Sequence, residues 1–200
     1  LDIRGAGNLL GAEQSGFITD MGFETYQKIL AEAMEELGVE TGITTRSADE
    51  GFVSDCTIET DQLALIPDSY IDRTAEKIRI YKELDSLSSD KEMEAMKSRL
   101  ADRFGPVPEE LLRLFDIVRI RQLGQKLGFE KIIIKNGVMI AFFISNPLSK
   151  YYRSDRFSKI LDGISASPKL FELKQNDSKL RIFVRNIDSI SKAYDILKRL

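Results

Sequence analysis

The stretch GPVPEELLRLFDIVRIRQLGQKLGFEKIIIKNGVMIAFFI (105–144) decides the fold, because its apolar pattern changes from helical to alternating within it. Gly105-Pro106 is typical of the end of one helix, and Pro108 of the first turn of the next. Apolar side chains then recur every three or four residues as far as Leu127. Gly128 follows as the C-terminal stop.

Beyond Gly128 the apolar period becomes two. The segments 131–135 and 138–144 flank Asn136-Gly137, which is the strongest short hairpin signal because both residues tolerate a positive φ. A long helix followed directly by a hairpin predicts an α+β fold.

Two further helices are predicted before this stretch. Pro67-Asp68 opens the first, with Asp68 as its N-cap. The second begins at Ser89, whose spacing to Glu92 matches a capping box, and continues to Phe104. With the helix that ends at Leu127, they form a three-helix region joined by short connections.

After the hairpin, the pattern predicts a helix at 150–163, strands at 169–174 and 180–185, and a last helix capped by Asp188. The order is ββαββα, which is typical of a small sheet covered by two helices.

The N-terminal part is irregular except for a helical pattern that begins at Phe23 and ends before Gly38. Residues 39–50 have no periodicity and are interpreted as a linker, and Phe52–Ile58 is predicted to be a strand with Cys56 pointing inward. We therefore expect three parts. Residues 1–50 are a helical segment with its linker, 51–129 a strand with the three-helix region, and 130–200 the ββαββα unit.

Composition excludes several classes of function. The chain has no histidine and a single cysteine, which removes His-dependent acid–base chemistry, the common catalytic triads and the usual zinc sites. No apolar run is long enough to span a membrane, and no signal peptide opens the chain. The absence of an initiator Met suggests a piece of a longer protein, and the lone cysteine fits a cytoplasmic location.

The charge is unevenly distributed. Residues 1–50 have a net charge of −7, whereas residues 128–200, with 14 basic and 7 acidic side chains, have a net charge of +7. A solvated surface explains such an excess most simply, but a basic last third also allows a free-standing nucleic-acid-binding module as an alternative function.

No catalytic, cofactor or metal site is predicted. Gly5, Gly7 and Gly11 resemble a dinucleotide-binding spacing, but neither the preceding hydrophobic strand nor the βαβ context is present. The chain also contains no phosphate-binding loop of the G-x-x-x-x-G-K-[ST] type, so we expect no ATPase site and no enzymatic activity in these residues.

Three stretches resemble one family. LDIRGAGNLLGAEQSG (1–16) is similar to the translocation motif shared by RecG and the transcription-repair coupling factors. LIPDSYIDRTAEKIRIYKEL (65–84) and SRLADRFGPVPEELLRLFDIVRIRQLGQKLGF (98–129) resemble the C-terminal domain that coupling factors have and RecG lacks. The chain is accordingly identified as the C-terminal part of a bacterial transcription-repair coupling factor.

The resemblance implies a parent protein that uses ATP and Mg²⁺ to translocate on double-stranded DNA, releases stalled RNA polymerase and recruits UvrA for excision repair. It implies that this C-terminal part masks the UvrA-binding surface of the parent's N-terminal UvrB-like module. In the translocation motif, it implies that Arg4 and Gln14 relay movements of the motor lobes, and that glycines permit the turns between them, namely Gly5, Gly7, Gly11 and Gly16.

The masked surface is expected to be arginine-rich, so the surface that covers it should offer carboxylates. The helix that begins at Ser89 is the best candidate, with Glu94, Asp102 and Arg103 as the expected interface residues. Arg99 on the same helix has the wrong charge for this partner unless it points away.

Overall fold

The computed structural model describes residues 52–176 and 179–200 of the chain. These residues form two compact units. The first, here called the helical unit, comprises residues 64–112, and the second, the sheet unit, comprises residues 52–63 and 113–200. The α+β class predicted from the sequence is confirmed. The predicted N-terminal helix and the linker at 39–50 lie outside the described residues.

The helical unit contains helix α3 (Thr74–Ser86), helix α4 (Asp90–Phe104) and the first turn of helix α5 (Glu109–Leu127). The three helices were predicted, but the start of α3 was placed too early. The amides of Tyr70 and Ile71 both donate to the carbonyl of Pro67, which makes a separate turn before the helix. Asp68 does not cap α3, since its carboxylate pairs with the buried Lys77.

The turn before α3 is held in place by buried contacts. The Tyr81 hydroxyl accepts a hydrogen bond from the Ile66 amide at 3.1 Å, and the Tyr70 hydroxyl donates to the carbonyls of Leu100 and Gly105 at 3.0 and 3.1 Å. The core of this unit consists of aliphatic, methionine and tyrosine side chains, namely Ile66, Ile71, Ile80, Tyr81, Leu84, Met93, Met96, Leu100 and Leu111. These contacts determine which faces of α3 and α4 remain exposed to solvent.

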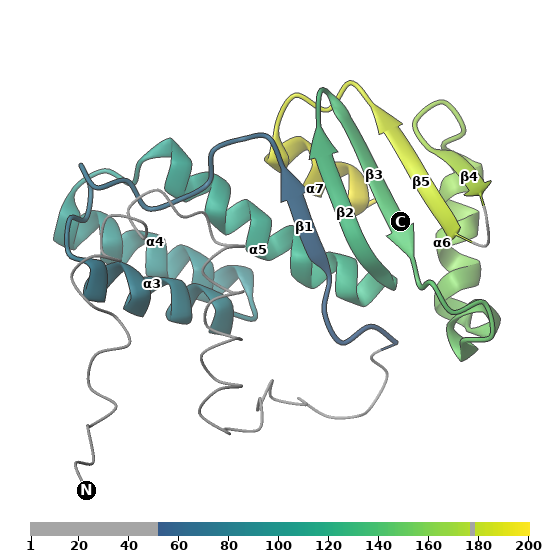
Figure 1. Cartoon of the computed structure of the whole chain (residues 1–200), viewed down its shortest axis with the longest axis horizontal. Helices are drawn as coiled ribbons and strands as arrows, with labels where there is room; N and C mark the ends of the chain where they lie inside the picture. Colours follow the sequence, from purple (N-terminus) through teal and green to yellow (C-terminus); the bar gives the residue numbers. More distant parts are fainter. Residues whose placement is uncertain (1–51, 177–178) are drawn as a thin grey trace, which may run out of the picture. The chain divides into compact units, whose positions relative to one another are not determined.

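The sheet unit is built on five strands in the order β1-β2-β3-β5-β4 (Figure 1). They are β1 (Thr57–Thr60), β2 (Phe129–Lys135), β3 (Val138–Phe143), β4 (Glu172–Asn176) and β5 (Lys179–Arg185). The β2–β3 hairpin is as predicted, with positive φ at both Asn136 and Gly137. All neighbouring strands are antiparallel except β1, which pairs in parallel with β2.

Strand β1 was grouped with the helices in the sequence analysis and predicted at Phe52–Ile58. It begins later, and its pairing with β2 makes it an edge of the sheet. Similarly, β4 begins at Glu172, after a turn in which the amides of Leu170 and Phe171 donate to the Ser167 carbonyl. The three domain boundaries expected from the sequence stay a proposal.

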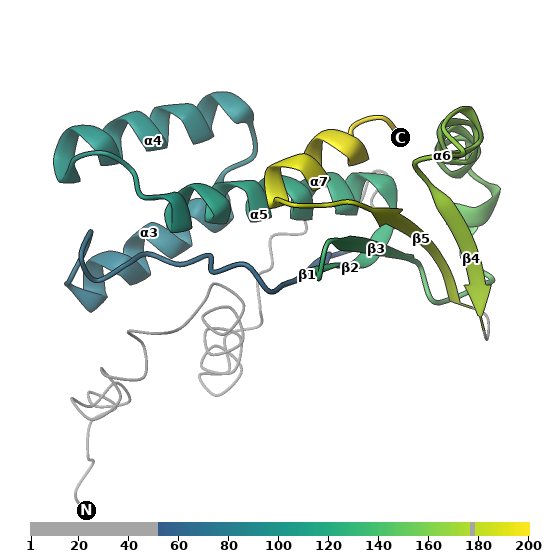
Figure 2. The same ribbon diagram turned by 90° about the horizontal axis from the view of Figure 1, so that it is seen from above.

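One face of the sheet is covered by helices, as Figure 2 shows. These are α5, α6 (Asp155–Ala166) and α7 (Ile190–Leu197), with a short 3₁₀ turn, η1 (Lys150–Arg153), before α6. The predicted helix at 150–163 is thus two elements. The cap of α7 is Ser189 rather than Asp188, because the Ser189 hydroxyl accepts from the Lys192 amide at 3.2 Å.

Residues buried between these helices and the sheet alternate along the strands, as the period of two requires. They include Ile58, Phe129, Ile132, Ile134, Met139, Ala141, Phe143, Ile182 and Val184. Tyr151 extends this core with an aromatic cluster that includes Phe143 and Phe157. The side chains between these buried positions lie on the opposite face of the sheet.

Candidate protein-binding site on helix α4

Helix α4 has a defined cap at each end and a single buried side. Its N-terminus is the predicted capping box: the Glu92 amide donates to the Ser89 hydroxyl at 3.3 Å, and the Ser89 amide donates to Glu92 at 3.1 Å. Gly105 ends it with a φ of 88°, a value that glycine adopts without strain. Three side chains on one side are buried, namely Met93, Met96 and Leu100. The opposite side faces outward.

Glu94, Ser98 and Asp102 lie one turn apart on that outward side, and all three are exposed. The carboxylate of Glu94 pairs with Lys97 at 2.9 Å, and 62% of its side chain remains exposed. The Ser98 hydroxyl donates to the Glu94 carbonyl at 2.9 Å, so this small side chain folds back onto the helix. The outward side of α4 therefore carries two exposed carboxylates, those of Glu94 and Asp102, with the small Ser98 between them.

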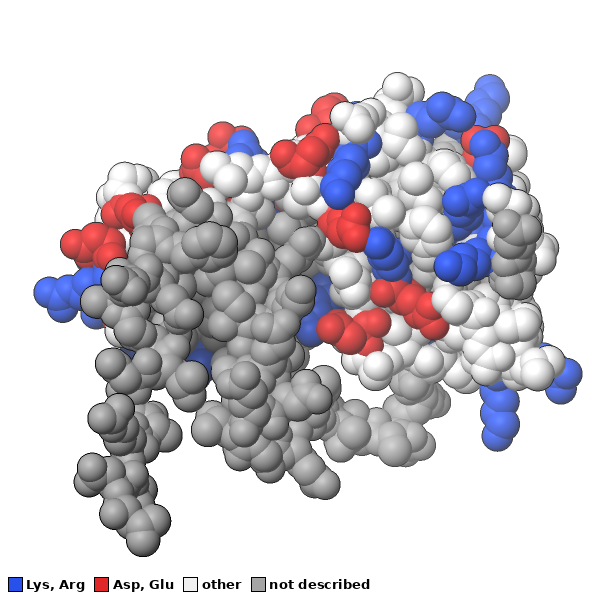
Figure 3. All heavy atoms as spheres, in the orientation of Figure 1, with Lys and Arg blue, Asp and Glu red and all other residues white. Residues whose placement is uncertain are grey.

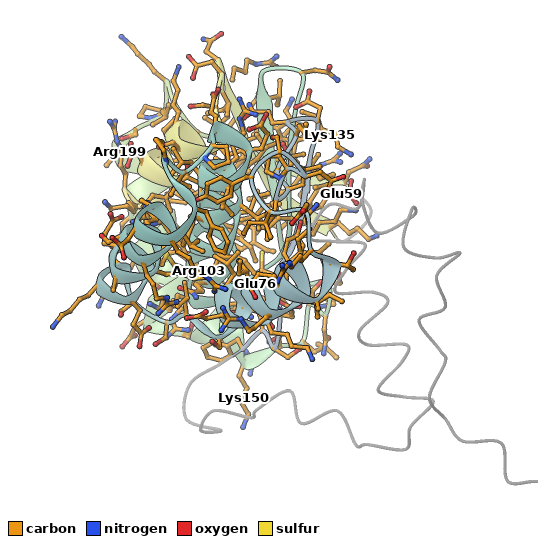
Figure 4. All side chains as sticks on the ribbon, turned by 90° about the vertical axis from the view of Figure 1, so that its left-hand side faces the viewer. Glu59, Glu76, Arg103, Lys135, Lys150 and Arg199 are labelled. Atoms are coloured by element: carbon orange, nitrogen blue, oxygen red, sulfur yellow. The ribbon has the colours of Figure 1, made fainter. Side chains whose placement is uncertain are left out.

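Arg103, the third expected interface residue, takes a different direction. It pairs with Glu76 of α3 at 2.6 Å, and its guanidinium lies 4.8 Å from the centre of the Phe104 ring. Figure 4 shows Glu76 and Arg103 next to each other. The structure therefore brings Glu94 and Asp102 to one face of α4 and directs Arg103 toward α3.

Arg99 also pairs with α3, through Glu83. The Glu76 carboxylate also pairs with Arg79, at 2.6 Å. The hydrogen bond from Arg79, together with the charge of Arg103, holds the Glu76 pKa below its ordinary value. Two glutamates thus engage three arginines along the α3–α4 seam. This seam was not foreseen, although the spacing of Arg99 and Arg103 at i and i+4 places them on one side of α4.

A shallow hollow lies on the same seam. It is lined by both charged and apolar side chains, namely Arg79, Ile80, Glu83, Arg99, Leu100, Arg103 and Phe104. Its charged groups are already paired, Arg99 with Glu83 across the hollow, and Arg79 and Arg103 with Glu76. We therefore assign it to the packing of α3 on α4 and not to a ligand.

Other residues singled out in the sequence have definite places. Cys56 is fully buried, and burial raises its pKa to about 12, so it packs as a small apolar residue, as predicted. The residues of the translocation motif, namely Arg4, Gly5, Gly7, Gly11, Gln14 and Gly16, lie outside the described residues.

Among residues 52–176 and 179–200, there is no group of three or more Asp, Glu or Cys side chains that could hold a metal ion. Over the same residues, no helix combines the length and the apolar character that crossing a membrane requires.

Comparison with known proteins points to one family. Residues 60–154 match the TRCF domain family. A transcription-repair-coupling factor from Rickettsia bellii is 34% identical over 94% of this chain and 15% of its own length. Those of Escherichia coli and Bacillus subtilis are 36% and 40% identical, each over 66% of this chain and 11% of their own length.

The fold agrees as well. A crystal structure of the C-terminal domain of a transcription-repair coupling factor superposes with a TM-score of 0.57, at 20% identity, over 72% of this chain and 86% of that one. The chain spans about 15% of the length of the Rickettsia relative. It belongs to the family of transcription-repair coupling factors, within which it corresponds to the C-terminal domain.

Proposed function

We propose that this chain is a regulatory, protein-binding region of a coupling factor and that it masks the UvrA-binding surface of the N-terminal UvrB-like module. In this proposal, the remainder of the longer protein supplies ATP-driven translocation on double-stranded DNA and acts on stalled RNA polymerase. The masking is released when translocation separates the two regions, which then allows UvrA to bind.

The observation that carries the proposal is the pair of exposed carboxylates on α4. Glu94 and Asp102 stand on a face whose neighbours are small, since Ala95, Ser98 and Ala101 are exposed beside them. An arginine-rich partner can approach such a face closely and form charge-assisted hydrogen bonds with both carboxylates.

The neighbouring arginines do not oppose this approach. Arg99 and Arg103 flank the acidic face, but each is engaged by a carboxylate of α3. Among the described residues, Arg99 is paired with Glu83 alone, whereas Arg103 shares Glu76 with Arg79. In this proposal Arg99 is directed toward α3 and away from the partner, and Arg103 supports the acidic face through Glu76 in place of a direct contact.

The test is a direct binding measurement between this chain and a separately purified N-terminal module of a coupling factor. Changing Glu94→Arg and Asp102→Arg together should weaken binding by about 2 kcal/mol or more, roughly thirty-fold in the dissociation constant, because two attractive contacts become repulsive. Isothermal titration calorimetry gives the affinity, and circular dichroism checks the fold.

A matched control carries the same change of charge elsewhere. Asp162 on α6 and Asp195 on α7 are both exposed, and the double variant Asp162→Arg, Asp195→Arg should bind as the unaltered chain does. Equal loss in both double variants would mean that only net charge matters. Full binding by the α4 variant would remove α4 from the interface.

A further inference from the structure

The sheet unit has a face that no described helix of that unit covers. Helices α5, α6 and α7 lie together on the other side of the sheet (Figure 2). The side chains of the open face are the ones between the buried positions of β2, β3 and β5. Figure 3 looks onto this face and shows basic side chains gathered toward the β5 side, next to uncharged surface.

The strand registers arrange these side chains in rows. Ile133, Ile140 and Phe183 are neighbours across β2, β3 and β5, and they make a continuous apolar row. Phe142 and Val138 lie on either side of it on β3. All five are aliphatic or aromatic side chains on the inner strands β2, β3 and β5, and yet all five are only partly buried.

Basic side chains border this apolar area. They are contributed by β2, β4 and β5, namely Lys131, Lys135, Lys174, Lys179, Arg181 and Arg185. Two carboxylates stand at the ends of the apolar row, Glu59 on β1 and Glu172 on β4. Asp61, directly after β1, adds a third carboxylate and accepts a hydrogen bond from the Asn136 amide, so six cations stand against three carboxylates and the face keeps a positive excess.

The two carboxylates are shared between cations. Glu59 pairs with Lys131 at 2.5 Å and with Lys135 at 3.2 Å, and Figure 4 shows Glu59 and Lys135 close together. Glu172 pairs with Lys174 at 2.9 Å and Arg185 at 3.5 Å. Hydrogen bonds from Lys131 and Lys174 hold the pKa of Glu59 and of Glu172, respectively, below the ordinary value, so both stay ionised.

Arg181 is the least satisfied of these cations. Its guanidinium lies 5.2 Å from the centre of the Phe183 ring, and its Nε is a buried nitrogen without a hydrogen-bond partner in the described part of the chain. A buried donor of this kind calls for an explanation, because leaving it unpaired is costly. An acceptor brought by a binding partner would satisfy it.

We propose that the open face of the sheet binds an acidic amphipathic protein segment, with apolar side chains of the segment on the Ile133–Ile140–Phe183 row and its carboxylates on the surrounding cations. An apolar centre inside a charged rim is the usual anatomy of a protein–protein interface. The charge of the rim selects a negative partner, opposite to the partner proposed for α4. This surface would be a second and separate docking site.

The details of the face favour protein over single-stranded nucleic acid. Nucleic acid needs aromatic rings whose faces are free for bases, but the Phe183 ring already has the Lys174 ammonium at 4.8 Å and the Arg181 guanidinium at 5.2 Å. The face has one further aromatic side chain, Phe142 on β3, and its remaining apolar side chains are aliphatic, so it lacks a series of open rings on which successive bases could stack.

The test uses synthetic peptides and the whole chain. The probe is a peptide with leucines along one helical face and glutamates beside them, and a peptide of the same composition with the order scrambled serves for comparison. Backbone amide shifts in an NMR titration should concentrate on β2, β3 and β5 for the first peptide. The affinity from fluorescence anisotropy should fall as salt is added.

Variants localise the binding. Arg181→Glu with Arg185→Glu should weaken binding at least about ten-fold, whereas Lys159→Glu with Lys169→Glu, the same charge change at exposed positions off the sheet, should not. Ile140→Ala, which only trims the apolar row, should also weaken binding and keeps the test valid if the charge variant misfolds. Equal binding of the scrambled peptide, shifts away from the sheet, or tighter binding of oligothymidylate would each overturn the proposal.

Discussion

Gly124 lies where helix α5 passes the start of β1, and the packing there leaves no room for a side chain. A Cβ at this position would lie 2.6 Å from the Cys56 Sγ and 3.0 Å from the Ile132 Cδ1. Alanine is normally the better helix residue by about 1 kcal/mol. We nevertheless expect Gly124→Ala to destabilise the sheet unit by about 1–3 kcal/mol, because overpacking a dense core outweighs helix propensity. Urea denaturation followed by circular dichroism measures the change.

A second substitution separates overpacking from other causes. Cys56→Ala removes the sulfur that the new methyl group would meet, so the double variant Gly124→Ala, Cys56→Ala should recover part of the lost stability. If the two substitutions add without recovery, contact with the sulfur is not the reason for the loss.

At the scale of residues, periodicity predicted which side chains of α4 would be outside. It placed Glu94 and Asp102 on the exposed side, where the structure has them. It could not show that Arg103 pairs with Glu76, because that contact depends on how α3 packs against α4. Which side chains of a helix are exposed can be predicted from the sequence of that helix alone, whereas an ion pair between two helices depends on how they pack together.

The elements with strong end signals were predicted best. The capping box at Ser89 and the Asn136-Gly137 turn are local, since a few consecutive residues specify each of them. The parallel pairing of β1 with β2 joins Thr57 to Lys131, and no short pattern encodes a pairing at that separation. The start of α3 was misplaced for a similar reason. Asp68 pairs with Lys77, a contact that the local sequence does not reveal, and it does not cap the helix.

The capping box of α4 should contribute measurably to stability. Ser89→Ala removes the acceptor for the Glu92 amide, so we expect a loss of about 1 kcal/mol. Ser98→Ala, within the same helix, is the matched control. Its hydroxyl donates to the Glu94 carbonyl within the helix, and alanine is the better helix former there. An equal loss in both variants, measured by thermal melting, would contradict a specific role of the cap.

The same cap predicts a pH dependence. Hydrogen bonds from the Ser88 amide and hydroxyl, and from Ser89, hold the Glu92 pKa below its ordinary value of 4.5. A carboxyl whose pKa is depressed by folding stabilises the native state above its unfolded pKa, and that contribution is lost as the pH falls through the folded pKa. The unaltered chain should therefore melt higher than Glu92→Gln at neutral pH, and the difference should shrink below pH ~4. A difference that stays constant across this range would exclude ionisation of Glu92 as its cause.

At the scale of the whole molecule, we expect no nucleotide chemistry in this chain. The sequence contains no phosphate-binding loop, and the described residues offer no group of metal ligands. Addition of Mg²⁺ and ATP should leave the melting temperature unchanged, because only a ligand that binds the native state raises it. A rise of several degrees would contradict this expectation and would call for a nucleotide site outside the features described above.

The two proposed binding faces belong to different compact units and have opposite charge. The acidic face of α4 lies in the helical unit, whereas the basic, apolar-centred face lies on the strands of the sheet unit. If each unit binds through its own face, damage to one should leave the other intact, since substitutions that share no partners act independently. Glu94→Arg with Asp102→Arg should weaken binding to the N-terminal module while acidic-peptide binding persists, and Arg181→Glu with Arg185→Glu should do the reverse. Both affinities can be measured on the same preparations. Loss of both activities in either variant, with circular dichroism unchanged, would mean that the two faces form one site or depend on each other.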